Sequence, residues 1–155
     1  MLKKDRERSA DFAWTVLEQA PYAVLAMSDG AQPYCIPVTP GACREKGVVY
    51  IHCARVGKKR EVLAKNARVC LTAVSRAASV EREFTMAFDS AVATGVVEEV
   101  EDREEKVAAM RILCERYDPK GMDLFDDVIS RCLGGTCVLR IRVEEITGKQ
   151  AHAMA

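Results

Sequence analysis

The sequence has neither an excess of one charge nor an apolar run long enough to cross a bilayer. Lysine plus arginine total 23 and aspartate plus glutamate total 23, so the formal net charge is zero. The global positive field that attracts nucleic acid or an anionic membrane is therefore missing. The first residues, MLKKDRERSADF, are charged and lack the apolar core of a signal peptide. We therefore expect a cytoplasmic protein that binds neither nucleic acid nor membrane.

Histidine is scarce, and the seven cysteines include no CxxC motif. An odd number of cysteines without a signal peptide favours reduced thiols over a disulfide framework. Cys132 and Cys137, in CLGGTC, are close enough in sequence to suggest a redox or metal site. Zinc would need two further ligands, and the only histidines are His52 and His152. We therefore predict no metal site.

Common nucleotide-binding motifs are also missing. No GxGxxG follows a predicted strand, and Gly57-Lys58-Lys59 lacks the upstream glycine and the following Ser/Thr of a P-loop. The βαβ alternation that those folds need is not present either. The chain shows no repeat, low-complexity tract or linker, so we expect residues 1–155 to form a single domain.

The most informative segment is VVYIHCARVGKKREVL, from Val48 to Leu63. It reads as a strand, a turn at Gly57, and a helix whose first turn carries Lys58, Lys59 and Arg60. The helix dipole makes each cation unfavourable there by about 0.3–1 kcal/mol. An anion beside the exposed amides would remove this conflict, which predicts a phosphate site. The alternative is a solvated helix face.

Hydrophobic periodicity and turn residues divide the rest of the chain into alternating strands and helices. Gly95 is a candidate β-bulge or point of close backbone approach within the segment 83–100. Ser9 is the expected N-cap of the first helix. Six or so antiparallel strands with peripheral helices predict an α+β fold built on a small barrel, since closure removes exposed strand edges. The expected helices span residues 9–20, 57–65, 101–117 and 122–132, the strands 22–27, 34–38, 48–53, 68–74, 83–100 and 136–146, and a polar loop 75–82.

Several segments together resemble a known family. They are PYCIPV (33–38), YIHCARVGKKREVL (50–63), NARVCLTAV (66–74), FDSAVATGVVEEVEDREEK (88–106) and EEITGK (144–149), in this order along most of the chain. The sequence is similar to the FMN-binding split-barrel superfamily of pyridoxamine 5′-phosphate oxidase-like proteins, and most similar within it to the nitroimidazole-resistance group. This resemblance implies a six-stranded antiparallel split β-barrel with peripheral helices, and a homodimer with FMN at the subunit interface.

The resemblance also implies roles for individual residues. Lys58 and Lys59 would face the FMN phosphate, with the amides near Gly57. Ile36, Pro37 and Val38 would border the flavin ring through backbone contacts. His52, Cys53 and Ala54 would lie along the flavin on the side of the substrate. Ser90 and Ala91 would complete the pocket, although Ser90 can equally be a plain strand hydroxyl. Asp89 departs from the family pattern, in which a basic or polar residue often precedes that serine.

These observations lead to two hypotheses of function. The first is an FMN-dependent oxidoreductase that reduces a small organic acceptor, such as a nitroaromatic compound, with His52 as the catalytic residue that donates a hydrogen bond or proton. The alternative role for His52 is a core histidine bonded to a backbone carbonyl. The second hypothesis is a non-catalytic protein that binds or senses FMN or haem, because histidine and cysteine both serve as axial ligands. A third possibility, a purely structural dimer with an empty pocket, would leave the cations at the start of the predicted helix, Lys58 and Lys59, unexplained.

Overall fold

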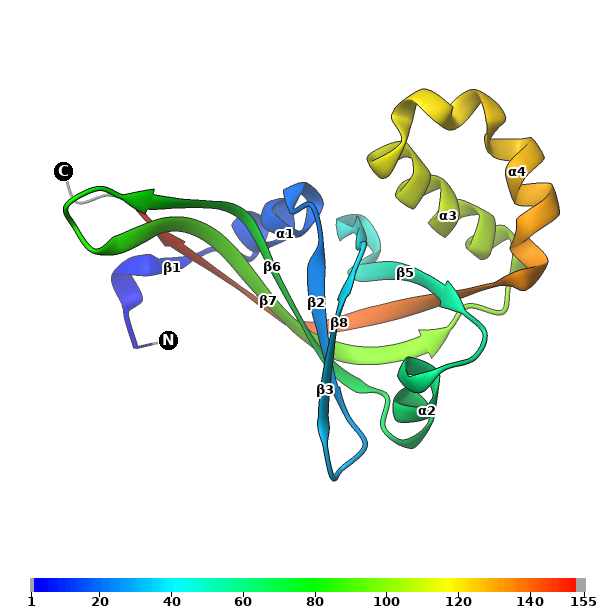
Figure 1. The fold of residues 1–155 in the computed structure, drawn as a ribbon, viewed down its shortest axis with the longest axis horizontal. Helices are drawn as coiled ribbons and strands as arrows, with labels where there is room; N and C mark the ends of the chain where they lie inside the picture. The colour runs from blue at the N-terminus through cyan, green and yellow to red at the C-terminus, as the bar shows by residue number, and fades with distance from the viewer. Residues whose placement is uncertain (1, 153–155) are drawn as a thin grey trace.

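The computed structural model describes residues 2–152, and its strands form one antiparallel sheet that curls into a split barrel (Figure 1). The strand order is β3-β2-β6-β7-β8-β5-β4, with β1 paired to β8. The bounds are β1 (Glu7–Arg8), β2 (Ala23–Ser28), β3 (Pro33–Val38), β4 (Gly41–Cys43), β5 (Val48–Ala54), β6 (Arg68–Val80), β7 (Thr85–Glu99) and β8 (Thr136–Ala151).

The predicted α+β fold is confirmed, but the sheet has eight strands rather than six. The two additional strands, β1 and β4, contain two and three residues, which is too short for a periodic pattern. The helices are α1 (Ala10–Gln19), α2 (Lys58–Lys65), α3 (Arg103–Tyr117) and α4 (Phe125–Cys132), with 3₁₀ turns η1 (Lys4–Arg6), η2 (Arg44–Lys46), η3 (Pro119–Leu124) and η4 (Leu133–Gly135). Within residues 2–152, no helix combines the length and apolar character that a membrane span needs.

The predicted loop at residues 75–82 is wrong over most of its length. Strand β6 continues to Val80 and pairs with β7 from Arg76↔Asp89 to Val80↔Thr85, which builds a hairpin arm. Figure 1 shows this arm extending away from the barrel. Neither face of the arm is buried in the core, so its residues do not alternate between polar and apolar and resemble a loop in sequence.

The predicted bulge at Gly95 is confirmed. The pairing of β7 with β8 shifts register between Thr94 and Gly95, and a Cβ at position 95 would lie 2.0 Å from the Arg142 backbone oxygen. Only glycine permits this approach of the two backbones, because any side chain would push the strands apart. The extra residue, Glu144, lies on β8, so the bulge bends β8 opposite Gly95.

Helix α1 packs against β6, β7 and β8, and its apolar side completes the main core. Its N-terminus is capped as the sequence predicted, since the Phe12 amide donates to Ser9 Oγ at 3.2 Å. Within the main core, the largest fully buried side chains come from α1 and four strands: Leu17, Leu25, Ile51, Leu71, Leu139 and Ile141.

Helix α3 is tied to the barrel at both ends. At its start, Glu105 accepts hydrogen bonds from the Tyr50 hydroxyl at 2.9 Å and from Arg140 at 2.8 Å. At its end, Arg116 donates to the backbone oxygens of Leu17, Ala20 and Pro40. Helix α4 then packs beside α3 around a small separate cluster of Phe125, Ile129 and Leu133.

Candidate functional site

A groove of about 310 Å³ lies where the ends of β3 and β5 approach the start of α2. Strand alternation aims His52 outward at the end of β5, whereas its neighbours Ile51 and Cys53 point toward the core. The groove is lined by Tyr22, Pro37, Val38, Thr39, His52 and Lys59. Four of these, Pro37, Val38, His52 and Lys59, are predicted site residues that come from three separate elements.

The other predicted residues on β3 and β5 do not present their side chains to the groove. Ile36 and Cys53 pack against the main core, so only their backbone atoms can face a bound molecule. Ala54 is exposed at the end of β5. This arrangement is compatible with the backbone contacts expected at residues 36–38.

The N-terminus of α2 presents uncapped backbone amides. Gly57, at the N-cap, has φ +117° and ψ 171°, and no side chain of the described residues caps the helix. This conformation is nearly restricted to glycine, which explains the residue type at this turn. The amides that precede the first intrahelical hydrogen bonds are therefore available to an anion.

The three cations at the start of α2 differ in whether an acidic side chain pairs with them. Arg60 forms an ion pair with Glu99 on β7, so its charge is used to hold α2 against the barrel. In the described part of the chain, Lys58 and Lys59 form no ion pair. Lys58 is exposed and Lys59 is half-buried beside the groove. The unbalanced positive charge is therefore confined to two lysines and the helix end.

His52 is exposed rather than part of the core, which argues against the core-histidine alternative. Partial desolvation, and then the positive charge of Lys59, lower the pKa of its imidazole. The neutral form consequently dominates at pH 7, with one ring nitrogen as donor and the other as acceptor.

Ser90 and Ala91 lie on β7, outside the lining of this groove. The Ser90 hydroxyl donates to the Lys149 backbone oxygen at 3.3 Å, and Ala91 is buried. The carboxylate of Asp89, the departure from the family pattern, pairs with Arg76 at 3.1 Å and accepts a hydrogen bond from Gln150 at 2.8 Å. Its negative charge is thus compensated within the chain.

Two groove residues, Tyr22 and Thr39, did not emerge from the sequence. Tyr22 directly precedes β2 and Thr39 directly follows β3, so both stand at the same end of one hairpin. Their only sequence signal was this position, since Pro21 and Pro40 next to them mark where regular structure ends. Over residues 2–152, no three His, Cys, Asp or Glu side chains gather as a metal site.

A stripe of apolar residues crosses the outer face of the sheet. Paired positions on β3, β2, β6 and β7 place Pro37, Val24, Thr72 and Val92 in one row, in which only Thr72 is polar and donates its hydroxyl to the Ala91 backbone oxygen. Val92 is 40% exposed and Val74, on the next row, is 45% exposed. Exposed apolar side chains arranged in a row are typical of a surface that another protein covers.

Comparison with known proteins identifies relatives over nearly the whole chain. The family model described as pyridoxamine 5′-phosphate oxidase matches residues 9–150. A proposed 5-nitroimidazole antibiotic resistance protein from Bacteroides thetaiotaomicron is 26% identical, with a TM-score of 0.75, and the match covers 92% of this chain and 84% of that one. No curated protein sequence matches this chain.

Two further solved structures share the fold at lower identity. The flavocytochrome Anf3 from Azotobacter vinelandii is 20% identical with a TM-score of 0.77, and the match covers 95% of this chain and 70% of that one. An FAD-binding protein from Mesorhizobium loti is 21% identical with a TM-score of 0.66, and the match covers 95% of this chain and 98% of that one.

Proposed function

Because the chain belongs to the pyridoxamine 5′-phosphate oxidase family, we propose that it is a flavoprotein oxidoreductase that binds FMN. The observation that carries this proposal is the uncapped start of α2 beside the groove that contains His52, where Lys58 and Lys59 form no ion pair with any residue from 2 to 152. A phosphate group suits such a helix start because amide dipoles and lysine charges both favour an anion. The solved relatives that are named for FAD or as a flavocytochrome support a flavin as the ligand.

The residues present fit the chemistry of FMN. The amides at Gly57 and the two lysines would hold the phosphate, and Pro37 and Val38 offer an apolar wall with backbone groups at its edge. Flavin binding needs these three features together, namely cations at the phosphate, an apolar wall and hydrogen-bond donors near the ring. The single phosphate of FMN requires only one cationic helix start of this kind, whereas FAD carries a second phosphate, so the site favours FMN over FAD.

His52 is proposed as the catalytic residue, which donates a hydrogen bond or a proton to the substrate. FMN, when bound, supplies a ring that takes up a pair of electrons from a donor and passes them to an acceptor. The neutral His52 imidazole donates an N–H hydrogen bond, and at a pH below its lowered pKa it carries the proton that a reduced acceptor must receive. Its exposure leaves it accessible to a substrate that enters from solvent.

The proposed acceptor is a small nitroaromatic compound. The 26% identical relative described as a proposed 5-nitroimidazole antibiotic resistance protein motivates this choice. A planar nitro compound could stack over a flavin in an open groove such as the one beside His52, since the groove is shallow on its solvent side. Other small planar acceptors would fit the same chemistry.

We further propose a homodimer in which the flavin lies between the subunits. The groove of one chain is open, so a single subunit would cover only one side of a bound flavin. The apolar stripe that includes Val24 and Val92, with Val74 on the next row, offers a surface for the second copy. In such a dimer, Ser90 of one subunit could approach the flavin held by the other.

The absorbance spectrum of the protein, purified without oxygen, tests the proposal most directly. We expect a yellow protein, or one that becomes yellow with FMN, and saturable FMN binding in calorimetry. Turnover would be measured as loss of nitroimidazole absorbance in the presence of a reduced donor. A colourless protein without calorimetric FMN binding would rule out the flavin, and bound flavin without turnover of any acceptor would restrict the role to binding.

The same spectrum distinguishes the second candidate function, haem binding. The exposed imidazole of His52 is a possible axial ligand, and one of the solved relatives is a flavocytochrome. A Soret band after reconstitution with haem, lost in His52→Ala, combined with no reduction of an acceptor, would favour a haem-binding or sensing protein.

A further inference from the structure

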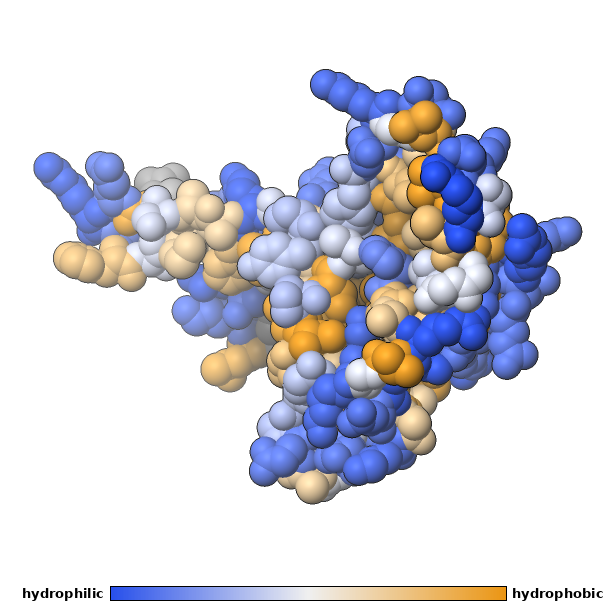
Figure 2. Space-filling model, turned by 45° about the vertical axis from the view of Figure 1, so that its right-hand side comes forward, coloured by the Kyte–Doolittle hydropathy of each residue, from blue (hydrophilic) through white to orange (hydrophobic). Residues whose placement is uncertain are grey.

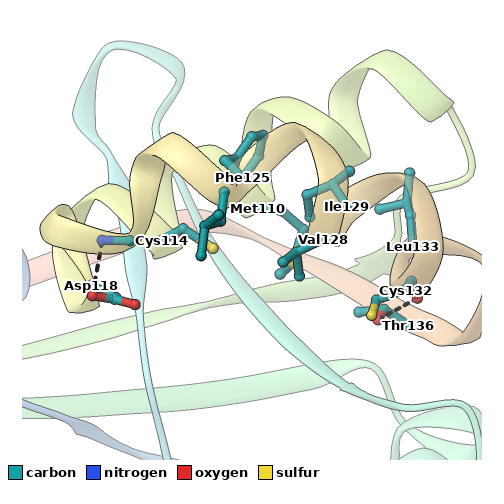
Figure 3. A pocket seen from close by; sticks show the side chains of 11 residues that line it. Met110, Cys114, Asp118, Phe125, Val128, Ile129, Cys132, Leu133 and Thr136 are labelled. Carbon is teal, nitrogen blue, oxygen red and sulfur yellow. Dashed lines mark hydrogen bonds between the residues drawn. The ribbon is translucent and has the colours of Figure 1, made fainter.

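A second cavity, unrelated to the flavin groove, lies between α3 and α4. Its volume is about 220 Å³, and it is more enclosed than the groove beside His52. Figure 2 shows hydrophobic side chains exposed among hydrophilic ones at this pair of helices. Figure 3 shows how the side chains of α3, α4 and the turns around them converge on the space.

The wall of this cavity is apolar and contains three sulfur atoms. Phe125, Ile129 and Leu133 are buried and form its inner side. Met110, Cys114 and Cys132 add a thioether and two thiols. Burial, followed by the charge of Asp118, raises the pKa of the Cys114 thiol, which therefore stays neutral at pH 7. The wall thus favours a polarisable, uncharged ligand.

The mouth of the cavity opens to solvent on the side of α4. Leu124 is 57% exposed and Val128 is 42% exposed, yet both line the cavity. Large apolar residues at these positions would ordinarily be buried, and a ligand in the cavity would cover part of them. The cavity is therefore accessible without movement of the barrel.

Polar groups are confined to the two ends. At one end the Thr136 hydroxyl donates to the Cys132 backbone oxygen at 3.1 Å, so its proton is already used. At the other end an Asp118 carboxylate oxygen accepts from the Gly121 amide at 3.2 Å (Figure 3). The second Asp118 oxygen accepts no hydrogen bond from residues 2–152 and remains an acceptor at the rim.

We propose that the cavity between α3 and α4 binds a small neutral aromatic molecule with one N–H or O–H donor, of the size of indole. An apolar cavity of about 150 Å³ accommodates benzene, so about 220 Å³ leaves room for a somewhat larger ring system. The Phe125 ring and the sulfur atoms of Met110 and Cys114 make favourable contacts with an aromatic ring. The donor of the ligand meets the free acceptor of Asp118.

This site is independent of flavin chemistry. None of the residues that line it lines the groove beside His52, and its helices belong to the separate Phe125 cluster rather than to the main core. Failure of the proposed oxidoreductase function would therefore leave this inference untouched, and the reverse also holds.

The test is a titration of the full-length protein with indole, followed by two-dimensional ¹H–¹⁵N NMR. We expect saturable shifts that are confined to α3, η3 and α4. Val128→Trp places a large side chain over the mouth and should weaken indole at least about tenfold. The matched control is Phe84→Trp, which adds the same indole group at the tip of the β6–β7 arm, where Phe84 is fully exposed, and should leave the affinity unchanged.

The role of Asp118 is tested with 1-methylindole, which lacks the donor. The wild-type protein should bind indole more tightly than 1-methylindole, and Asp118→Asn, whose amide oxygen can still accept from Gly121, should remove that preference. Absence of saturable shifts, or equal affinity in Val128→Trp and the wild type, would overturn the proposal. Shifts of the same amides on raising the protein concentration alone would assign the cavity to contact with a second copy, and would overturn it as well.

Discussion

His52 and Lys59 line the same groove, and the charge of Lys59 adds to desolvation in lowering the pKa of the His52 imidazole. The two residues are separated by a turn and lie on different elements, β5 and α2. This proximity links the proposed phosphate corner to the proposed catalytic residue. An anion bound beside Lys59 would offset the lysine charge and raise the pKa of His52 toward its ordinary value of 6.5.

Lys59→Gln should raise the pKa of His52, but only in part, because desolvation is the larger cause of the shift. An NMR titration of the imidazole C–H signals measures this directly. Since the folded pKa lies below the unfolded one, the unfolded state binds more protons and stability falls as pH decreases below about 6.5. The variant should show a shallower fall. Lys58→Gln, one residue away and outside the groove, is the control, and an unchanged His52 pKa in Lys59→Gln would contradict the coupling.

The double change Lys58→Gln and Lys59→Gln should weaken FMN at least about tenfold, or about 1.4 kcal/mol, while leaving riboflavin nearly unaffected. Riboflavin lacks the phosphate, so it isolates the contribution of the cationic corner. Calorimetry with both ligands is the measurement. Lys120→Gln changes an exposed lysine of η3, away from the groove, and should behave as the wild type. An equal loss for both ligands would place the lysines elsewhere than at the phosphate.

Gly57→Ala should destabilise the protein by about 1–3 kcal/mol, the usual cost of a non-glycine residue in such a backbone conformation. Nothing lies within 4 Å of a Cβ at position 57, so the cost comes from the backbone and not from a clash. Gly134→Ala is a matched control, because its Cβ also meets open space but its φ is not positive. Urea unfolding of the two variants should differ accordingly, and similar midpoints would argue against strain at Gly57.

Tyr50→Phe should lower the free energy of unfolding by about 1.5 kcal/mol, in the range for a hydrogen bond to a charged group. Burial and the adjacent Glu105 carboxylate raise the pKa of the Tyr50 phenol, so the hydroxyl keeps its proton and donates at every physiological pH. Tyr22→Phe, at an exposed tyrosine, should cost much less. If the two variants unfolded at the same urea concentration, the bond from Tyr50 to Glu105 would not be what anchors α3.

Asp29→Asn should flatten the acid dependence of stability between about pH 4 and pH 2. The amides of Gln32 and Ala31 donate to this carboxylate, and Lys65 lies 3.3 Å away, which together lower its pKa from 3.8 to about 2. A depressed folded pKa contributes stability above the unfolded value, and this contribution is lost as pH falls toward 2. Acid unfolding followed by circular dichroism measures it, with exposed Asp123→Asn as control. Identical acid slopes for the two variants would contradict the assignment.

Local features of the fold could be predicted well from the sequence. Ser9 caps α1, and Gly95 lies at the register shift between β7 and β8. Each of these depends on side-chain chemistry within a few residues, or on the conformational freedom of one glycine. The β6–β7 arm was missed because pairing with another strand, rather than burial of one face, holds it extended.

The candidate site could likewise be predicted only in part from the sequence. A cationic helix start after a strand was evident from Gly57, Lys58 and Lys59, because the helix dipole acts over a single turn. That Arg60 is paired with Glu99, 39 residues away, could not be predicted, since the partner arrives through the folding of β7 beside α2. Tyr22 and Thr39 were missed because their place in the groove likewise depends on how elements distant in the sequence pack together.

The sequence by itself determined six of the eight strands, the N-cap of α1, the irregularity at Gly95 and the cationic start of α2, because these depend on periodicity and on contacts between neighbouring residues. Only the tertiary structure decided that His52 lies outside the core beside Lys59, that Ser90 bonds to Lys149, and that α3 and α4 enclose a cavity. These features join residues distant in the chain, and their geometry follows from how the sheet curls and where Arg116 and Tyr50 hold α3 against it.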